Sequence, residues 1–267
     1  MPGRALKIYT YALLAFIYVP IAFMVIMSFN SSPYVGEWRG FTLKWYQLLL
    51  EDERTARAFN NSFTIAASSA LVSTLIAFPA AYHTSRSGRL RALSAITAPP
   101  IVIPEITEAV SLLVLFLYIE FPLGWLSVLI AHTAFNVAYA YMTLTIIGGP
   151  EGEIVAAART LGASKTLIWR RIIIPLSMPG IVAALMLTFM LSFTDFIKTL
   201  FTKGPGFETL PILVWNRARR PGLTEFSSQN ALNALTTLLI LVSISVAVAY
   251  MVLVLRRSRI TRVIGVE

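Results

Sequence analysis

Long apolar segments alternate with shorter polar segments along the whole chain. A membrane-spanning helix needs about 20 predominantly apolar residues, and six segments reach that length. The predicted spans cover residues 8–29, 62–84, 92–118, 124–147, 177–201 and 231–255. The pattern therefore predicts an all-α membrane protein with six transmembrane helices. Because the number of spans is even, both termini are expected on the same side of the membrane.

The composition supports this prediction and narrows the chemistry. Hydrophobic residues make up 57% of the 267 residues and charged residues only 13%, whereas a soluble domain has about a quarter of its residues charged. The absence of cysteine excludes disulfides, thiol catalysis and Cys-based metal sites, and with two distant histidines no metal site is expected. The net charge of +9 is explained by orientation in the membrane and by anionic lipid headgroups, so no nucleic-acid partner is expected.

Lysine and arginine are distributed unevenly between the two sets of loops. More than half of the 22 Lys and Arg residues lie at the two ends of the chain and in the loops after the second and fourth spans. Cytoplasmic segments carry the excess of cations in membrane proteins. This distribution predicts that both termini and the loop at residues 148–176 are cytoplasmic, in a multi-pass protein of the inner (plasma) membrane.

Acidic residues in the third span are the first candidates for function. Pro99, Pro100 and Pro104 predict a break or kink near the middle of this span. Glu105 and Glu108 follow, three residues apart and therefore on one helix face. A charge at the membrane centre costs about 2.5–3.5 kcal/mol, so it is usually kept for a partner or a pathway. Each glutamate could bond a neighbouring helix, but two close acids repel unless they share a cation or a proton, which favours a cation pathway.

The fourth and fifth spans hold further polar candidates. Asp195 either forms a local ion pair with Lys198, three residues on, or lines the route of a cationic substrate. The fourth span places a polar stripe on one helix face. Its members are His132, Asn136, Tyr139 and Thr143. Contacts between helices explain such a stripe more readily than ligand binding, although both interpretations stay open.

The cytoplasmic loop at 148–176 is polar but helical in composition, and Gly162 interrupts it where a helix would end. The loop resembles the EAA loop of ABC-importer permeases: a Glu-Ala-Ala triplet, a Gly four positions on, then nine residues before Ile-x-Leu-Pro. The residues in register are Ala157, Ala158, Gly162, Ile172 and Pro175. Ala156 stands in place of the glutamate, and Ile174 in place of the leucine.

Most of the chain also resembles the permease subunit of spermidine/putrescine ABC importers, the PotC type. The matching runs are residues 28–32, 40–42, 44–46, 111–116, 161–164, 204–205, 210–211 and 233–235, and Trp38 and Phe135 match as single residues. The family carries an Asp where Glu105 stands and two Asp residues where Thr194 and Asp195 stand, and His132 matches it. Glu108 has no counterpart in the family pattern, which could indicate a different substrate.

The resemblance implies a type I ABC importer (MetI-like) permease fold, with residues 1–267 forming one transmembrane domain and half of a pathway for polyamines or a similar organic cation. The implied partners are a second homologous permease, two ATPase subunits and an extracytoplasmic solute-binding protein. ATP and Mg would stay on the ATPases, since this chain shows no phosphate-binding loop, and the chain itself would be neither an enzyme nor a cofactor carrier.

The loop would couple to the ATPase through a helix at about residues 153–165. The residues expected to contribute are Glu153, Ala157, Ala158, Gly162, Ser164 and Pro175. Glu153, one turn before Ala156, is a candidate replacement for the missing glutamate. Gly162 would permit the turn after this helix, and Pro175 would set how the chain re-enters the membrane.

Several alternatives stay open at this point. The same architecture could import a sugar, iron, thiamine or a phosphonate. An ion-coupled secondary carrier could use Glu105, Glu108 and Asp195 as relay groups, but it would not explain the EAA spacing. The sequence leaves the exact substrate open, as well as the choice between a homodimer and a heterodimer.

Overall fold

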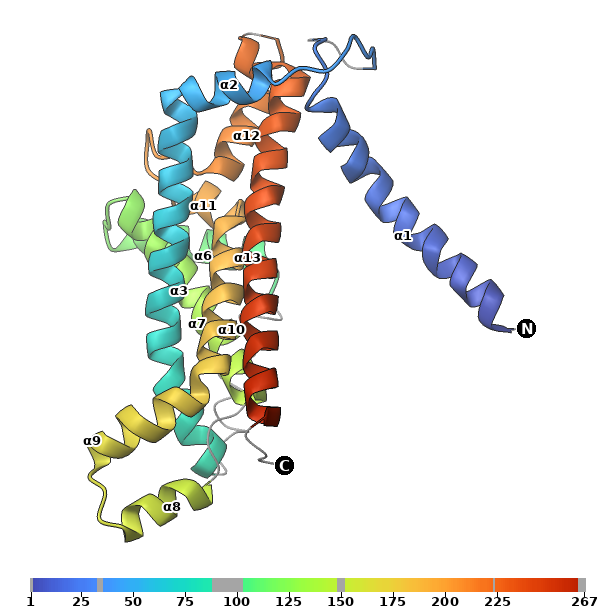
Figure 1. The fold of residues 1–267 in the computed structure, drawn as a ribbon. Helices are drawn as coiled ribbons and strands as arrows, with labels where there is room; N and C mark the ends of the chain where they lie inside the picture. Colours follow the sequence, from blue (N-terminus) through green and yellow to red (C-terminus); the bar gives the residue numbers. More distant parts are fainter. Residues whose placement is uncertain (1, 33–35, 88–102, 148–151, 223, 264–267) are drawn as a thin grey trace. The chain divides into compact units, whose positions relative to one another are not determined.

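The computed structural model describes residues 2–32, 36–87, 103–147, 152–222 and 224–263, most of which are helical (Figure 1). Six longer helices are α1 (Pro2–Met27), α3 (Glu53–Ser87), α6 (Glu105–Tyr118), α7 (Trp125–Ile147), α10 (Ile174–Phe193) and α13 (Gln229–Val263). The shorter elements are α2 (Lys44–Glu51), α8 (Gly152–Thr160), α9 (Lys165–Ile168), a π-helical turn η1 (Trp169–Ile173), α11 (Ile197–Thr202), α12 (Leu210–Ala218) and a 3-10 turn η2 (Glu225–Ser227).

Five stretches of the described helices are long and apolar enough to cross a membrane. They are Leu6–Met27, Glu53–Thr84, Trp125–Ile147, Lys165–Phe193 and Gln229–Ala249. Each overlaps one predicted span, and the prediction of an all-α membrane protein is confirmed for the described residues.

The third predicted span, 92–118, differs from the other five. Its first part lies outside the described residues, and α6 begins only at Glu105, after the non-helical residues Ile103 and Pro104. The 14 residues of α6 reach only about 21 Å, less than the roughly 30 Å of a bilayer core. Ile103 and Pro104 are not helical, in keeping with the predicted break, since a proline ring cannot continue a helical hydrogen-bond ladder; Pro99 and Pro100 lie outside the described residues.

The predicted bounds of the fifth span, 177–201, are wrong at both ends. The helical segment starts at Lys165, where the Ser164 hydroxyl accepts a hydrogen bond from the Leu167 N–H and caps the first turn. It ends at Phe193, and residues 194–196 separate α10 from α11. There the Asp195 side chain accepts the Thr199 N–H at 3.0 Å, a local bond that competes with continuing the helix.

The chain divides into two compact units. The first comprises Met1–Ala58 and Leu210–Val242, and the second Phe59–Thr209 and Ser243–Glu267. In the first unit Trp45 is buried, and its indole N–H donates to the Asn30 carbonyl oxygen at 2.7 Å. The Asn30 side chain in turn bonds the backbone of residues 32, 37 and 39, so a loop before α2 is held together by one buried amide.

The second unit is packed mainly with small side chains. Alanines on α3, α7 and α10 form a buried cluster with Tyr141 and Leu144; these alanines are Ala77, Ala81, Ala140 and Ala184. Small residues let helix backbones approach closely, which is how helices associate in lipid. This close packing brings the polar side chains of α7 against those of α10 and α11.

Candidate functional site

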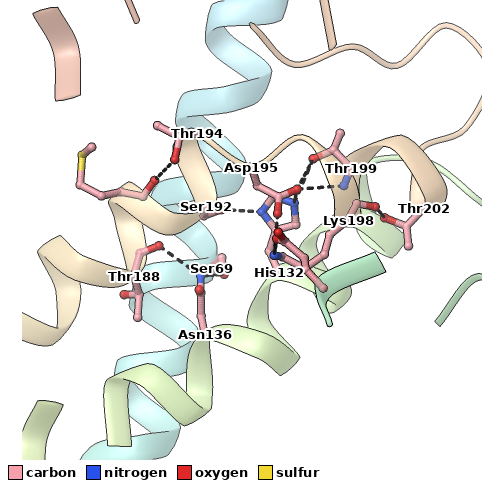
Figure 2. Close-up of polar contacts among 12 residues, drawn as sticks. Ser69, His132, Asn136, Thr188, Ser192, Thr194, Asp195, Lys198, Thr199 and Thr202 are labelled. Atoms are coloured by element: carbon pink, nitrogen blue, oxygen red, sulfur yellow. Dashed lines mark hydrogen bonds and ion pairs between the residues drawn. The ribbon is translucent and has the colours of Figure 1, made fainter. Parts of the chain in front are cut away.

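A buried polar cluster occupies the break between α10 and α11 in the second unit. Asp195 lies there with its side chain 1% exposed, and Lys198 Nζ is 2.6 Å from Asp195 Oδ2. His132, from α7, places Nε2 3.3 Å from Asp195 Oδ1. Figure 2 shows these three side chains pointing toward one another. The local Asp195–Lys198 pair is therefore present, but it is part of a larger set of contacts.

Two hydroxyl groups orient the His132 ring. Nδ1 lies 2.6 Å from Ser192 Oγ, and Nε2 lies 3.0 Å from Thr199 Oγ1. Thr199 Oγ1 donates onward to Asp195 Oδ1 at 3.2 Å. These contacts link His132 to Asp195 both directly and through the Thr199 hydroxyl.

Glu105 joins the cluster from the first turn of α6. Its carboxylate accepts a hydrogen bond from the Lys198 ammonium, while its own side chain is 41% exposed. The same ammonium lies 3.9 Å from the centroid of the Phe135 ring. One buried lysine therefore contacts two carboxylates and an aromatic face, contributed by α6, α7 and the segment after α10.

Next to the cluster is a hollow of about 300 Å³. It is lined mainly by apolar side chains, with Glu108, Lys198 and Phe135 among them. Glu108 is half-buried, and within the described ranges it forms no hydrogen bond or ion pair. Three carboxylates, those of Glu105, Glu108 and Asp195, thus lie around one ammonium. The surplus of negative charge is suited to a cation.

Asn136 lies one helical turn beyond His132 on α7 but has different partners. Its side-chain amide donates to Ser69 Oγ at 2.8 Å and to the Thr188 carbonyl oxygen at 3.2 Å. Asn136 therefore joins α3, α7 and α10 (Figure 2). In the polar stripe of α7, His132 and Asn136 make contacts between helices, while the Thr143 hydroxyl bonds the Tyr139 carbonyl oxygen of its own helix.

The residues with the EAA spacing form a second region. α8 ends at Thr160, five residues earlier than the predicted helix at 153–165, and Gly162 follows with φ +78°. Val155 of α8 packs in one buried cluster with Ile168 and Ile173. This cluster fixes α8 against the helical segment that continues into α10.

The side chains expected to contact an ATPase are mostly exposed. They are Glu153, Ala157, Ser164 and Pro175, with Ala158 half-buried. At the other end of this region, Trp169 packs edge-on against Phe78 of α3 at 5.9 Å between ring centroids. One face of α8 is therefore exposed, while its Val155 side packs against the helical segment that leads into α10.

Of the predicted site residues, the structure brings Glu105, Asp195 and His132 together, with Glu108 beside them along the hollow. Sequence reasoning noted Phe135 only as a family match and did not assign Phe135, Ser192 or Thr199 to the site. The usable signal was the spacing of Ser192, Asp195 and Thr199, which follows helical periods of three and four residues. Among the described residues, no group of three or more acidic or histidine side chains is placed to hold a metal ion.

Residues 69–261 match the family described as "Binding-protein-dependent transport system inner membrane component". The chain belongs to this family. It is therefore a multi-pass inner-membrane component of a transport system.

Two relatives are similar over most of their length. One is the spermidine/putrescine transport system permease protein PotC of Escherichia coli K12, with 34% identity over 254 residues, covering 93% of this chain and 94% of the relative. The other is the putrescine transport system permease protein PotI of the same strain, 35% identical over 236 residues and covering 84% and 82% of the two chains. The expected resemblance is confirmed.

Among solved structures, a bacterial ABC transporter involved in the import of the acidic polysaccharide alginate has a chain with TM-score 0.68 and 19% identity, covering 94% of each chain. This likeness concerns the fold, and it confirms that of a type I ABC importer permease.

Proposed function

We propose that this chain forms half of the translocation pathway of an ATP-driven importer for spermidine, putrescine or a similar small organic cation. The names of the two relatives support this substrate class. The observation that carries the proposal is the cluster of three carboxylates around one ammonium beside the hollow. Its uncompensated negative charge would attract a cation and would repel an anion such as a phosphonate.

The importer would contain a second, related permease, two ATPase subunits and a solute-binding protein on the outer side. The facing half of the pathway would come from the second permease. ATP and Mg would be bound by the ATPases, and this chain would carry out no chemical step itself. Both of its termini and the α8 region would lie in the cytoplasm.

Coupling would run through α8, whose exposed face would dock on an ATPase. ATP can drive a change of conformation only if it binds one arrangement of the complex more tightly than the other. Because Val155 packs against Ile168 and Ile173, a displacement of α8 would be passed to α10. Glu153, exposed in the first turn of α8, would take the place of the motif's glutamate, which is replaced by alanine at position 156.

A transport assay on the assembled importer tests this proposal. The complex would be expressed with its partner subunits, reconstituted into vesicles and supplied with ATP and labelled putrescine or spermidine. We expect uptake by the wild type and a reduction of about tenfold or more for Glu108→Gln, since the carboxylate beside the hollow loses its charge. Glu120→Gln, an exposed glutamate after α6, is the matched control and should transport normally.

Other outcomes would point elsewhere. Uptake of a sugar or an anion in place of polyamines would overturn the substrate class while leaving the importer architecture intact. Uptake driven by an ion gradient without an ATPase would overturn the coupling mechanism. Assembly with an ATPase that survives Glu153→Ala with normal coupling would remove Glu153 from its assigned role.

A further inference from the structure

The environment of the Lys198 ammonium is that of a bound ligand. Its Nζ is paired with Asp195 Oδ2 at 2.6 Å and with the Glu105 carboxylate, and the Phe135 ring centroid is 3.9 Å away. The residue as a whole is 2% exposed. An ammonium group has three N–H donors and no acceptor, so two carboxylates and an aromatic face satisfy it without water.

None of these three partners recognises the lysine as such. Asp195 and Glu105 bind through the ammonium, and Phe135 attracts the positive charge through the negative face of its ring. The lysine stem is only the means by which the charge reaches the site. Any primary ammonium group on an unbranched alkyl chain could make the same contacts.

The site is also next to accessible space. Lys198 and Phe135 both line the hollow of about 300 Å³ that contains the Glu108 side chain. If the Lys198 side chain were cut back to Cβ, the space of its removed atoms would join that hollow. A small ligand in the hollow could then reach Asp195 and Glu105.

We propose that Asp195, Glu105 and Phe135 form a binding site for a primary ammonium group, and that Lys198 fills this site from within the chain. The lysine is a tethered substitute for one ammonium of a ligand. Its presence limits how much positive charge the hollow accepts. With Lys198 in place, Glu108 is the carboxylate of the hollow that forms no ion pair among the described residues, so the hollow takes one further ammonium group.

The assignment of the ammonium site stands apart from transport, whereas its meaning for substrate choice rests on the proposed function. If the substrate is a polyamine, Lys198 determines how many of its charged groups bind here. A variant without the lysine head group should accept a polyamine with one more ammonium in preference to a diamine.

Chemical rescue of Lys198→Ala tests the site directly. The substitution removes Cγ, Cδ, Cε and Nζ, which together correspond to n-propylammonium. The assembled, purified complex would be heated in detergent with n-propylammonium chloride at millimolar concentration, with n-propyltrimethylammonium chloride, or with NaCl at equal ionic strength. The variant should melt several degrees below the wild type in NaCl, because two carboxylates lose their cation.

We expect n-propylammonium to restore most of this loss, and n-propyltrimethylammonium to restore little, because its methyl groups cannot donate hydrogen bonds to the carboxylates. Lys44→Ala is the matched control, since Lys44 also contacts a carboxylate, that of Glu225, and the Trp45 ring, but its side chain is 54% exposed. Three outcomes would each overturn the proposal. They are no rescue of Lys198→Ala by n-propylammonium, equal rescue of Lys198→Ala by the two ammonium cations, and rescue of Lys44→Ala to the same extent as Lys198→Ala.

If Lys198→Ala does not assemble, the double variant Lys198→Ala/Glu105→Gln keeps the test decisive, because it leaves one unpaired carboxylate and not two. It should still be stabilised by n-propylammonium, more weakly than by a full site, and no stabilisation would contradict the site. These melting experiments do not require uptake. A failed rescue with normal polyamine uptake rejects the ammonium site alone, and a successful rescue without polyamine uptake rejects the proposed substrate alone.

Discussion

At the scale of single residues, two buried polar contacts show how side chains hold this chain together away from the proposed pathway. The first is the Asn136 amide, which is 1% exposed and bonded to Ser69 and to the Thr188 backbone. The second is the contact of Asp52 with Arg217 in the other compact unit. For each contact, we predict that replacing the buried residue destabilises the chain more than replacing an exposed residue of the same or a similar type.

Replacing Asn136 by alanine should destabilise the chain by about 1–2 kcal/mol, because hydrogen bonds between membrane helices are worth about that much at most and a void also remains. Asn60→Ala should have little effect, since Asn60 is exposed on α3. Thermal unfolding of the purified complex measures both. Equal losses for the two variants would contradict the role of Asn136.

Asp52 lies between α2 and α3, outside the spans, and Arg217 is buried beside it. Its Oδ2 accepts the Thr55 hydroxyl at 2.6 Å, and Arg217 pairs with the same oxygen. Burial raises the pKa of Asp52, but the hydrogen bonds from Thr55 and Arg217 and the charge of Arg217 outweigh it, so the pKa falls below its ordinary value of 3.8.

A carboxyl whose pKa is lowered on folding stabilises the native state above its unfolded pKa, and the contribution is lost as the pH falls through the folded pKa. At neutral pH, Asp52→Asn should therefore lower the free energy of unfolding by about 1 kcal/mol, the net value of a typical hydrogen bond, and this difference from the wild type should shrink as the pH drops below about 3.8. Glu53→Gln is the control, because Glu53 and Arg57 form an exposed pair of little value. Unfolding at a series of pH values would show a constant difference if the pair did not contribute.

At the scale of elements, the turn between α8 and α9 depends on one residue. Gly162 has φ +78°, and a Cβ placed there would meet no other atom within 4 Å. The obstacle to substitution is thus backbone conformation and not space. For other residues this left-handed conformation costs about 1–2 kcal/mol, with asparagine tolerating it best.

Gly162→Ala should accordingly shift α8 and weaken the coupling between ATP hydrolysis and uptake, with Gly162→Asn less affected and Gly162→Pro most. Gly152→Ala is the matched control, since Gly152 also has open space around it but no positive φ. The ratio of ATP hydrolysed to substrate imported, measured in vesicles, reports the effect. An unchanged ratio in Gly162→Pro would count against transmission through α8.

At the scale of the whole molecule, the arrangement across the membrane is open to a direct test because the chain has no cysteine. Single cysteines can be placed at Gln47, exposed on α2, and at Thr160, exposed at the end of α8. A membrane-impermeant maleimide should label Gln47→Cys in spheroplasts, in which the inner membrane is intact. It should label Thr160→Cys only after the inner membrane is opened. Labelling of both from one side would overturn the predicted topology.

The larger features of this chain were readable from residues close together in the sequence. Span positions follow from local hydropathy, so five predicted spans overlap the observed ones. The turn at Gly162 and the start of α6 directly after Pro104 follow from the backbone preferences of glycine and proline. The expected helix at 153–165 was too long and the span at 177–201 misplaced, because hydropathy does not register the cap formed by Ser164 or the hydrogen bond from the Thr199 N–H to Asp195.

What the sequence could not determine is which acidic groups are already paired. Lys198 contacts Glu105 across 93 positions, and His132 meets Ser192 across 60. A Cβ on Gly204 would lie 2.1 Å from the Leu123 carbonyl oxygen, an approach that no local pattern reveals. Hydropathy and backbone preference act between neighbours, whereas charge pairing depends on the distances that helix packing creates. The sequence alone therefore determined a membrane-spanning helical chain with acidic residues in it, and the tertiary structure decided which of those acids already have a cation.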